Sequence, residues 1–118
     1  MPTTDPDCLF CKIVAGDIPA TIVARTDRAV AFRDIDPKAP THALVIPAEH
    51  HANLAAAAAA DPALVGDMVT LAAEVAAQDG VAESGYRLVA NTGRDAEQTV
   101  FHAHLHVLGG RSLTWPPG

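Results

Sequence analysis

Residues 101 to 108 alternate strictly between apolar and histidine side chains: Phe101-His102-Ala103-His104-Leu105-His106-Val107-Leu108. Because successive side chains of a β-strand point to opposite faces, this period predicts a strand that turns its apolar residues toward a core and its histidines toward one surface. Side chains on the same face are about 6.5–7 Å apart, so we expect the three rings to form one continuous row. Three buried histidines would need three buried partners, so the pattern indicates a functional site.

Similar runs predict four further strands, over residues 21–25, 29–33, 41–47 and 85–91. The polar pair Asp27-Arg28 separates the first two runs, which therefore read as a hairpin. Pro47 ends the third run, because proline cannot donate a hydrogen bond to a neighbouring strand.

Two segments have helical patterns. Residues 8–14 predict a short helix that ends at Gly16, and a long helix opens at Asp61-Pro62 and ends at Gly80. The apolar stripe of the long helix consists of Leu64, Met68, Leu71 and Val75. The alanine run 55–60 fits either a helix or a loop.

The composition indicates one globular domain over residues 1–118, with 49% hydrophobic and 19% charged residues. A net charge of −6 argues against nucleic acid as the main partner, although a small anion in a local pocket is compatible with it. The acidic segment 1–7, which we expect to be flexible, lacks the features of a signal peptide. No apolar run approaches the roughly 20 residues that span a bilayer, so we expect a cytoplasmic protein without a membrane partner.

Cys8 and Cys11 share one face of the predicted short helix. Two buried thiols, a redox pair and half of a zinc site are all compatible with this spacing.

Two other polar residues each have a structural and a functional interpretation. Asp34 is a loop acid or a ribose-binding acid, and His42 is a structural histidine or a group that supports the histidine row.

The histidine segment resembles the signature of the histidine triad (HIT) family, His-φ-His-φ-His-φ-φ with φ apolar. Flanking motifs resemble the Hint branch in the family's order, from about residue 8 to the last residue. They are Phe10-Cys11-Lys12-Ile13, Ile18-Pro19-Ala20, Phe32-Arg33-Asp34-Ile35, Ala39-Pro40-Thr41-His42, Val45-Ile46-Pro47, Asn91-Thr92-Gly93, Gln98-Thr99-Val100-Phe101 and Trp115-Pro116-Pro117-Gly118. The resemblance implies an α+β fold, a five-stranded antiparallel sheet with one long and one short helix, and a homodimer whose two sheets run into each other.

The resemblance also implies an activity on small-molecule purine nucleotides. Members of the Hint branch cleave purine nucleoside 5′-phosphoramidates, such as adenosine phosphoramidate or adenylyl-lysine, and release AMP through a covalent nucleotidyl-histidine. Relatives in another branch cleave dinucleoside polyphosphates, which is one alternative. A nucleotide-binding regulatory dimer without turnover is a second, and a metalloenzyme whose histidine row binds catalytic zinc is a third.

The family's catalytic roles fall on five residues of this chain. His104 matches the nucleophile, which is plausible because a neutral imidazole attacks phosphorus and its ordinary pKa is about 6.5. His106 would protonate the leaving amine or hold the phosphate oxygens, with Thr99 assisting. The backbone carbonyl of His102 would orient the nucleophile, and His42 matches a supporting histidine behind it. This chemistry requires no cofactor.

The resemblance places Asp34 on the ribose hydroxyls and Asn91 beside the ribose and phosphate. Backbone N–H groups around Gln98-Thr99 would meet the phosphate charge. The C-terminal tail, residues 111–118, is expected near the active site, with Trp115 reaching the site of the partner protomer. The side chains expected around the base are Phe10, Ile13, Phe32 and Ile35.

Zinc-binding bacterial members of the family have a Cys-x-x-Cys pair completed by two histidines. The matching residues here are Cys8, Cys11, His50 and His102, and His51 could replace His50. Four nitrogen and sulfur ligands without an open position make a structural zinc site.

Three residues depart from the Hint pattern. Thr99 stands where serine is usual, and Arg33 stands where histidine is common. Glu97 stands where glycine is frequent and brings a negative charge toward an anionic substrate. We expect this charge either to lower affinity or to favour a cationic leaving group such as lysine.

Overall fold

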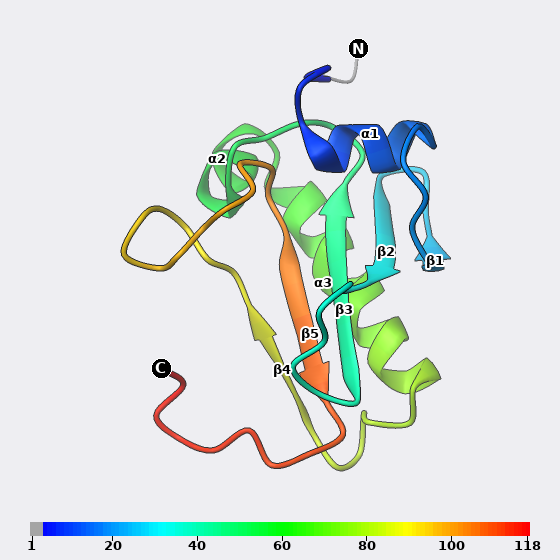
Figure 1. Cartoon of the computed structure of the whole chain (residues 1–118), viewed down its shortest axis with the longest axis vertical. Coiled ribbons are helices and arrows are strands. Elements are labelled where there is room, and N and C mark those ends of the chain that lie inside the picture. Colours follow the sequence, from blue (N-terminus) through cyan, green and yellow to red (C-terminus); the bar gives the residue numbers. More distant parts are fainter. Residues whose placement is uncertain (1–3) are drawn as a thin grey trace.

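The computed structural model describes residues 4–118, so residues 1–3 of the segment expected to be flexible lie outside it. A five-stranded antiparallel sheet with the order β1-β2-β3-β5-β4 forms its centre (Figure 1). The strands are β1 (Ile22–Arg25), β2 (Ala29–Arg33), β3 (Thr41–Pro47), β4 (Tyr86–Val89) and β5 (Leu105–Gly109). The expected α+β fold with five antiparallel strands is confirmed.

Three helices accompany the sheet: α1 (Leu9–Ala15), α2 (Leu54–Ala60) and α3 (Pro62–Gln78). The expectation of one long and one short helix therefore missed α2, which the alanine run had left open. Its start is set by Asn53, whose side chain accepts a hydrogen bond from the Ala56 N–H at 2.8 Å. Asp61 ends α2 and caps α3, so the two helices follow each other directly.

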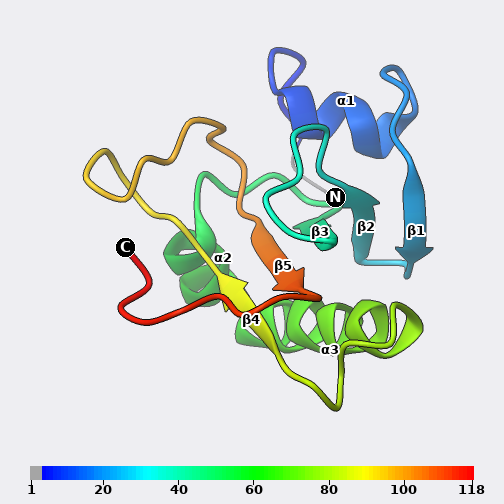
Figure 2. The same ribbon diagram turned by 60° about the horizontal axis from the view of Figure 1, so that its bottom comes forward.

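The helices cover both faces of the sheet, with α3 on one side and α1 on the other (Figure 2). The predicted stripe of α3 is buried, and it packs on strand residues such as Val45 and Val107. On the opposite face, Phe10 and Ile13 of α1 pack on Phe32 and its neighbours.

The strand β5 is shorter than the alternation predicts, since it begins at Leu105. Its pairing with β3 ends at Val45, and Pro47 has no N–H to extend the ladder. The backbone N–H of Ala103 instead donates to the carbonyl of His51, in a loop, at 2.7 Å. The prediction of a strand from residue 101 is therefore wrong for its first half, although Ala103 still faces the core.

Within residues 4–118, no helix combines the length and the apolar character needed to cross a membrane.

Candidate active site

Pairing of β3 with β5 brings two histidines together on the sheet face opposite α3. His42 lies opposite Leu108 and His106 lies opposite Leu44, so the two histidines are diagonal neighbours on one face. His42 Nε2 and His106 Nδ1 are 2.9 Å apart. The structure therefore places His42 beside His106, which is two residues along the chain from the expected nucleophile His104.

The ring of His104 is held by its own backbone. Its Nδ1 lies 2.7 Å from the carbonyl oxygen of His102. A carbonyl only accepts hydrogen bonds, so Nδ1 carries the proton and Nε2 keeps a free lone pair. The rings of Phe10 and His106 lie edge-on to His104, with centroids 5.3 and 5.2 Å away. An oriented imidazole with a free lone pair is a suitable nucleophile.

Burial keeps the paired histidines neutral. It lowers the pKa of His106 to about 4, and the neighbouring imidazoles of His104 and His42 act in the same direction. Burial also lowers the pKa of His42, although the carboxylate of Asp34 opposes this. At neutral pH the pair therefore carries no charge.

The histidine pair opens into a hollow of about 720 Å³ that is also lined by Asn91 and Glu97. A second, mainly apolar hollow of about 440 Å³ lies beside α1. Asp34 lines both hollows. The second hollow contains all four side chains that the sequence places around a base, Phe10, Ile13, Phe32 and Ile35.

Gln98 and Thr99 are not among the residues that line the hollow of the histidine pair. Thr99 is exposed and lines a separate hollow with Cys8 and Phe101. Gln98 is buried, and its side-chain amide donates to the carbonyls of Ala52 and Val100. Its side chain thus stabilises the loop before β5.

The C-terminal tail is held by Arg87, a residue that the sequence analysis did not single out. Its guanidinium donates to the carbonyls of Leu113 at 3.2 Å and Thr114 at 2.7 Å, and lies 5.8 Å from the centre of the Trp115 ring. Trp115 itself is 80% exposed. Farther along, the tail residues 117–118 line the larger hollow.

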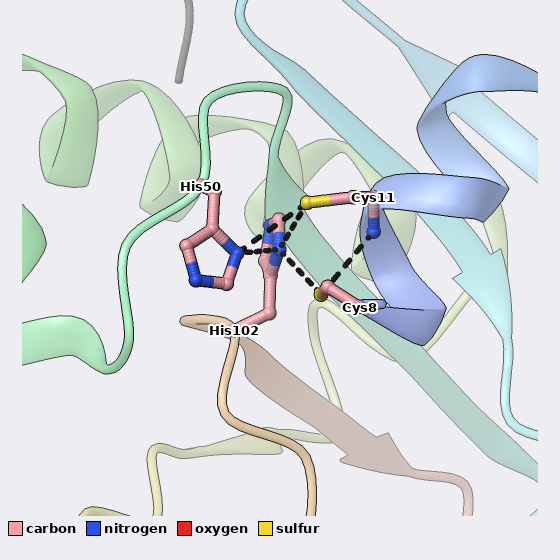
Figure 3. A group of neighbouring side chains, drawn as sticks. All are labelled: Cys8, Cys11, His50 and His102. Carbon is pink, nitrogen blue, oxygen red and sulfur yellow. Dashed lines mark hydrogen bonds between the residues drawn. The ribbon is translucent and has the colours of Figure 1, made fainter. Parts of the chain in front are cut away.

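His102 does not join the other two histidines in a row, since its ring is fully buried in a different cluster (Figure 3). Its Nδ1 lies 3.3 Å from the sulfur of Cys8, 3.5 Å from the sulfur of Cys11 and 3.2 Å from Nδ1 of His50. The sulfur of Cys11 is also 3.4 Å from Nδ1 of His50. The expectation of one continuous row of three rings is therefore wrong.

These four side chains fit a tetrahedral metal ion. Ligands at usual zinc distances would be about 3.3–3.8 Å apart, close to the separations above. His102 Nε2 lies 2.9 Å from the carbonyl of Pro47 and so carries the proton, which leaves a lone pair on Nδ1 toward the sulfurs. Burial lowers the pKa of His102 to about 4. Cys8, Cys11, His50 and His102 can therefore hold a metal.

The neighbouring His51 lies outside this cluster. Its Nε2 is 3.1 Å from a carboxylate oxygen of Glu49, without hydrogen-bond geometry. Of the two histidines that the sequence left open, the structure brings His50 to the cysteines.

Comparison with known proteins agrees with this architecture. The family model of the HIT domain matches residues 15–113. An uncharacterized HIT-like protein of Synechococcus elongatus is 52% identical over 112 residues, which are 95% of this chain and 97% of the relative. The purine nucleoside phosphoramidase of Escherichia coli is 46% identical over 107 residues, 91% of this chain and 90% of the relative.

A HIT family hydrolase from Legionella pneumophila gives a TM-score of 0.91 at 48% identity, and the match covers 95% of this chain and 100% of the other. The family model covers most of the chain, and the relatives agree over nearly their whole length. The chain therefore belongs to the HIT family.

Proposed function

We propose that the protein hydrolyses purine nucleoside 5′-phosphoramidates and releases the nucleoside monophosphate. The observation that carries this proposal is the hydrogen bond from His104 Nδ1 to the His102 carbonyl, which leaves Nε2 free to attack phosphorus. The similarity to the Escherichia coli purine nucleoside phosphoramidase supports the substrate class.

The reaction would proceed in two displacements at phosphorus. His104 Nε2 forms a bond to the α-phosphorus, and the phosphorus–nitrogen bond to the amine breaks. The amine leaves with the bonding electron pair and takes up a proton from solvent water. Water then cleaves the nucleotidyl-His104 and regenerates the free imidazole. The neutral His106 lies next to this position and would hold the phosphate oxygens.

The two hollows suggest how a nucleotide would lie. The base would enter the apolar hollow beside Phe10 and Phe32, and the phosphate would approach the histidines. Asp34 borders both spaces, so its carboxylate would accept hydrogen bonds from the ribose hydroxyls between them. Asn91 in the larger hollow would lie near the ribose and phosphate.

Quenched reactions with a phosphate-labelled adenosine 5′-phosphoramidate test this proposal. We expect AMP release, and a label that is stable in base, labile in acid and mapped to His104. His104→Ala should bind AMP normally but lose turnover. A label on another residue, or equal rates in the variant and the wild type, would overturn the mechanism. If a dinucleoside polyphosphate were cleaved faster than the phosphoramidate, the protein would instead be a dinucleoside polyphosphate hydrolase.

We also propose that Cys8, Cys11, His50 and His102 bind a structural zinc ion. The set has two sulfur and two nitrogen ligands and no open position, as in structural sites. Bound zinc would tie α1 to the segment before β5 and would take no part in the reaction.

Metal analysis of the purified protein, with cobalt as a spectroscopic substitute, tests the zinc site. We expect one metal per chain and a thiolate-to-cobalt absorption band. Both should be lost in His50→Ala and kept in the matched control His51→Ala. Retention of the metal in His50→Ala would remove His50 from the ligand set.

A homodimer is proposed through β4, which is an edge strand of the sheet. A second copy of β4 would satisfy its unpaired backbone groups and extend the sheet across both chains. Light scattering after size-exclusion chromatography should give twice the chain mass of 12.2 kDa. A single-chain mass at micromolar concentration would contradict this arrangement.

A further inference from the structure

Arg111, just after β5, holds the loop that connects β2 to β3. Its Nε and Nη2 both donate to the carbonyl oxygen of Lys38, at 3.0 and 2.9 Å. At the preceding Gly110, φ is 92°, and a Cβ atom would come within 2.8 Å of Pro40. The end of β5 is therefore in close contact with this loop, and Arg111 fixes the position of Lys38.

The other side of Lys38 contacts the active site. Its backbone N–H donates to His42 Nδ1 at 3.0 Å. A ring nitrogen that accepts a hydrogen bond carries no proton, so the neutral His42 carries its proton on Nε2. That nitrogen is 2.9 Å from His106 Nδ1, which is its nearer acceptor, and 3.4 Å from a carboxylate oxygen of Asp34. The neutral His106 consequently carries its own proton on Nε2.

The opposite tautomers would weaken the stabilisation of the phosphate charge in the transition state. If the Lys38 N–H moved away, His42 could carry its proton on Nδ1. Its Nε2 would then accept a hydrogen bond from His106 Nδ1, and His106 Nε2 would become a lone pair. A lone pair repels phosphate oxygens, whereas an N–H donor stabilises the charge that develops on them in the transition state.

We propose that Arg111 is a positioning residue that sets the tautomers of His42 and His106 through the backbone of Lys38. It keeps the Lys38 N–H against His42, so that His106 presents a donor to the phosphate. The catalytic consequence rests on the proposed function, whereas the tautomers themselves do not depend on it.

The first test is nitrogen-15 NMR of the histidine rings at neutral pH, with signals assigned from His42→Gln and His106→Asn. In the wild type we expect the Nε2–H form at both residues. In Arg111→Gln we expect His42 to populate both tautomers. Arg25→Gln is the matched control, because Arg25 is also exposed and also donates to a backbone carbonyl, that of Val14, at 3.1 Å.

The second test is steady-state kinetics with adenosine phosphoramidate. Arg111→Gln should lower kcat by roughly tenfold and change KM by less than about twofold, because the lost stabilisation belongs to the transition state. Arg111→Lys serves as a second variant with the charge retained, and it should fall between Arg111→Gln and the wild type. Emission from Trp115, the single tryptophan, reports whether the tail has moved.

Several outcomes would overturn the inference. They are a proton on His42 Nδ1 in the wild type, unchanged tautomers in Arg111→Gln, and altered tautomers with an unchanged kcat in an active enzyme. A shifted Trp115 emission with unchanged tautomers would instead assign Arg111 to the tail. Altered tautomers in Arg111→Gln, together with a wild type that cleaves no phosphoramidate, would leave the inference standing and reject only the proposed function.

Discussion

Glu97, at the edge of the larger hollow, has a backbone conformation that is unusual for its residue type. Its φ is 59°, in the left-handed region, where a side chain costs about 1–2 kcal/mol relative to glycine. Glu97 also lines the hollow that contains the histidine pair. Glu97 therefore combines backbone strain with a negative charge near the proposed phosphate position.

Two substitutions separate these effects. Glu97→Gln keeps the strain and removes the charge, so the KM of an uncharged-amine phosphoramidate should fall roughly two- to threefold at low salt. For a substrate whose amine carries a second, protonated amino group, the same change should raise KM. Glu97→Gly should in addition raise the free energy of unfolding by about 0.5–1 kcal/mol. Steady-state kinetics and urea titration measure these changes, and equal KM values at low salt would contradict the charge effect.

Candidate site residues could be predicted from the sequence where they belong to a local motif. The alternation marked His104 and His106, and the family resemblance marked Asp34. Neither signal could mark Arg111, because it acts on Lys38, 73 residues away, through a backbone carbonyl that any residue type provides. Arg87 was missed for the same reason, since it binds backbone groups of a segment 26 residues distant.

At the scale of the elements, an ion pair connects β2 to the end of α3. Both terminal nitrogens of Arg33 contact Asp79, at 2.5 and 2.8 Å, and the Thr41 hydroxyl donates to the same carboxylate at 2.9 Å. The hydrogen bonds from Arg33 lower the pKa of Asp79. The arginine that replaces the histidine common in the Hint branch therefore has a structural partner in this chain.

Loss of this pair should destabilise the fold. Arg33→Gln leaves the mostly buried Asp79 without its charged donor, so we expect the free energy of unfolding to fall by about 1–2 kcal/mol. Urea denaturation measures the change. Arg94→Gln, which removes the fully exposed partner of Asp95, is the control and should have no measurable effect. Equal losses in both variants would argue against a specific role for the pair.

Elements with a strong internal period were predicted well, and elements set by contacts elsewhere were not. The stripe of α3 and the strand β3 follow directly from spacing and from Pro47. The start of β5 depends on where β3 stops and on the loop carbonyl of His51, and alternation alone reports neither. The helix α2 has no apolar period, so only its cap at Asn53 could have indicated it.

At the scale of the whole molecule, buried neutral histidines make stability depend on pH. The pKa of His106 is lowered to about 4, against about 6.5 in an unfolded chain. Between these values the unfolded state binds more protons than the folded state. The contribution of His106 to the free energy of unfolding is therefore fully present above about pH 6.5 and is lost as the pH falls toward 4.

Urea titrations at several pH values test this dependence. After allowance for solvent screening, His106 should account for about 1–2 kcal/mol of the loss between pH 6.5 and 4. His106→Asn should show a shallower fall over that range. An identical pH dependence in the variant and the wild type would show that other groups cause the acid sensitivity.

His102 connects the cysteine pair to His104, the proposed nucleophile. Its ring lies among the sulfurs, and its carbonyl oxygen orients His104. The ring and that oxygen belong to the same residue, so a displacement of the ring reaches the oxygen through Cβ, Cα and the carbonyl carbon of His102. We therefore expect an oxidant that joins Cys8 to Cys11 to misorient Nε2 of His104, the proposed nucleophile, although neither sulfur has a role in the proposed reaction.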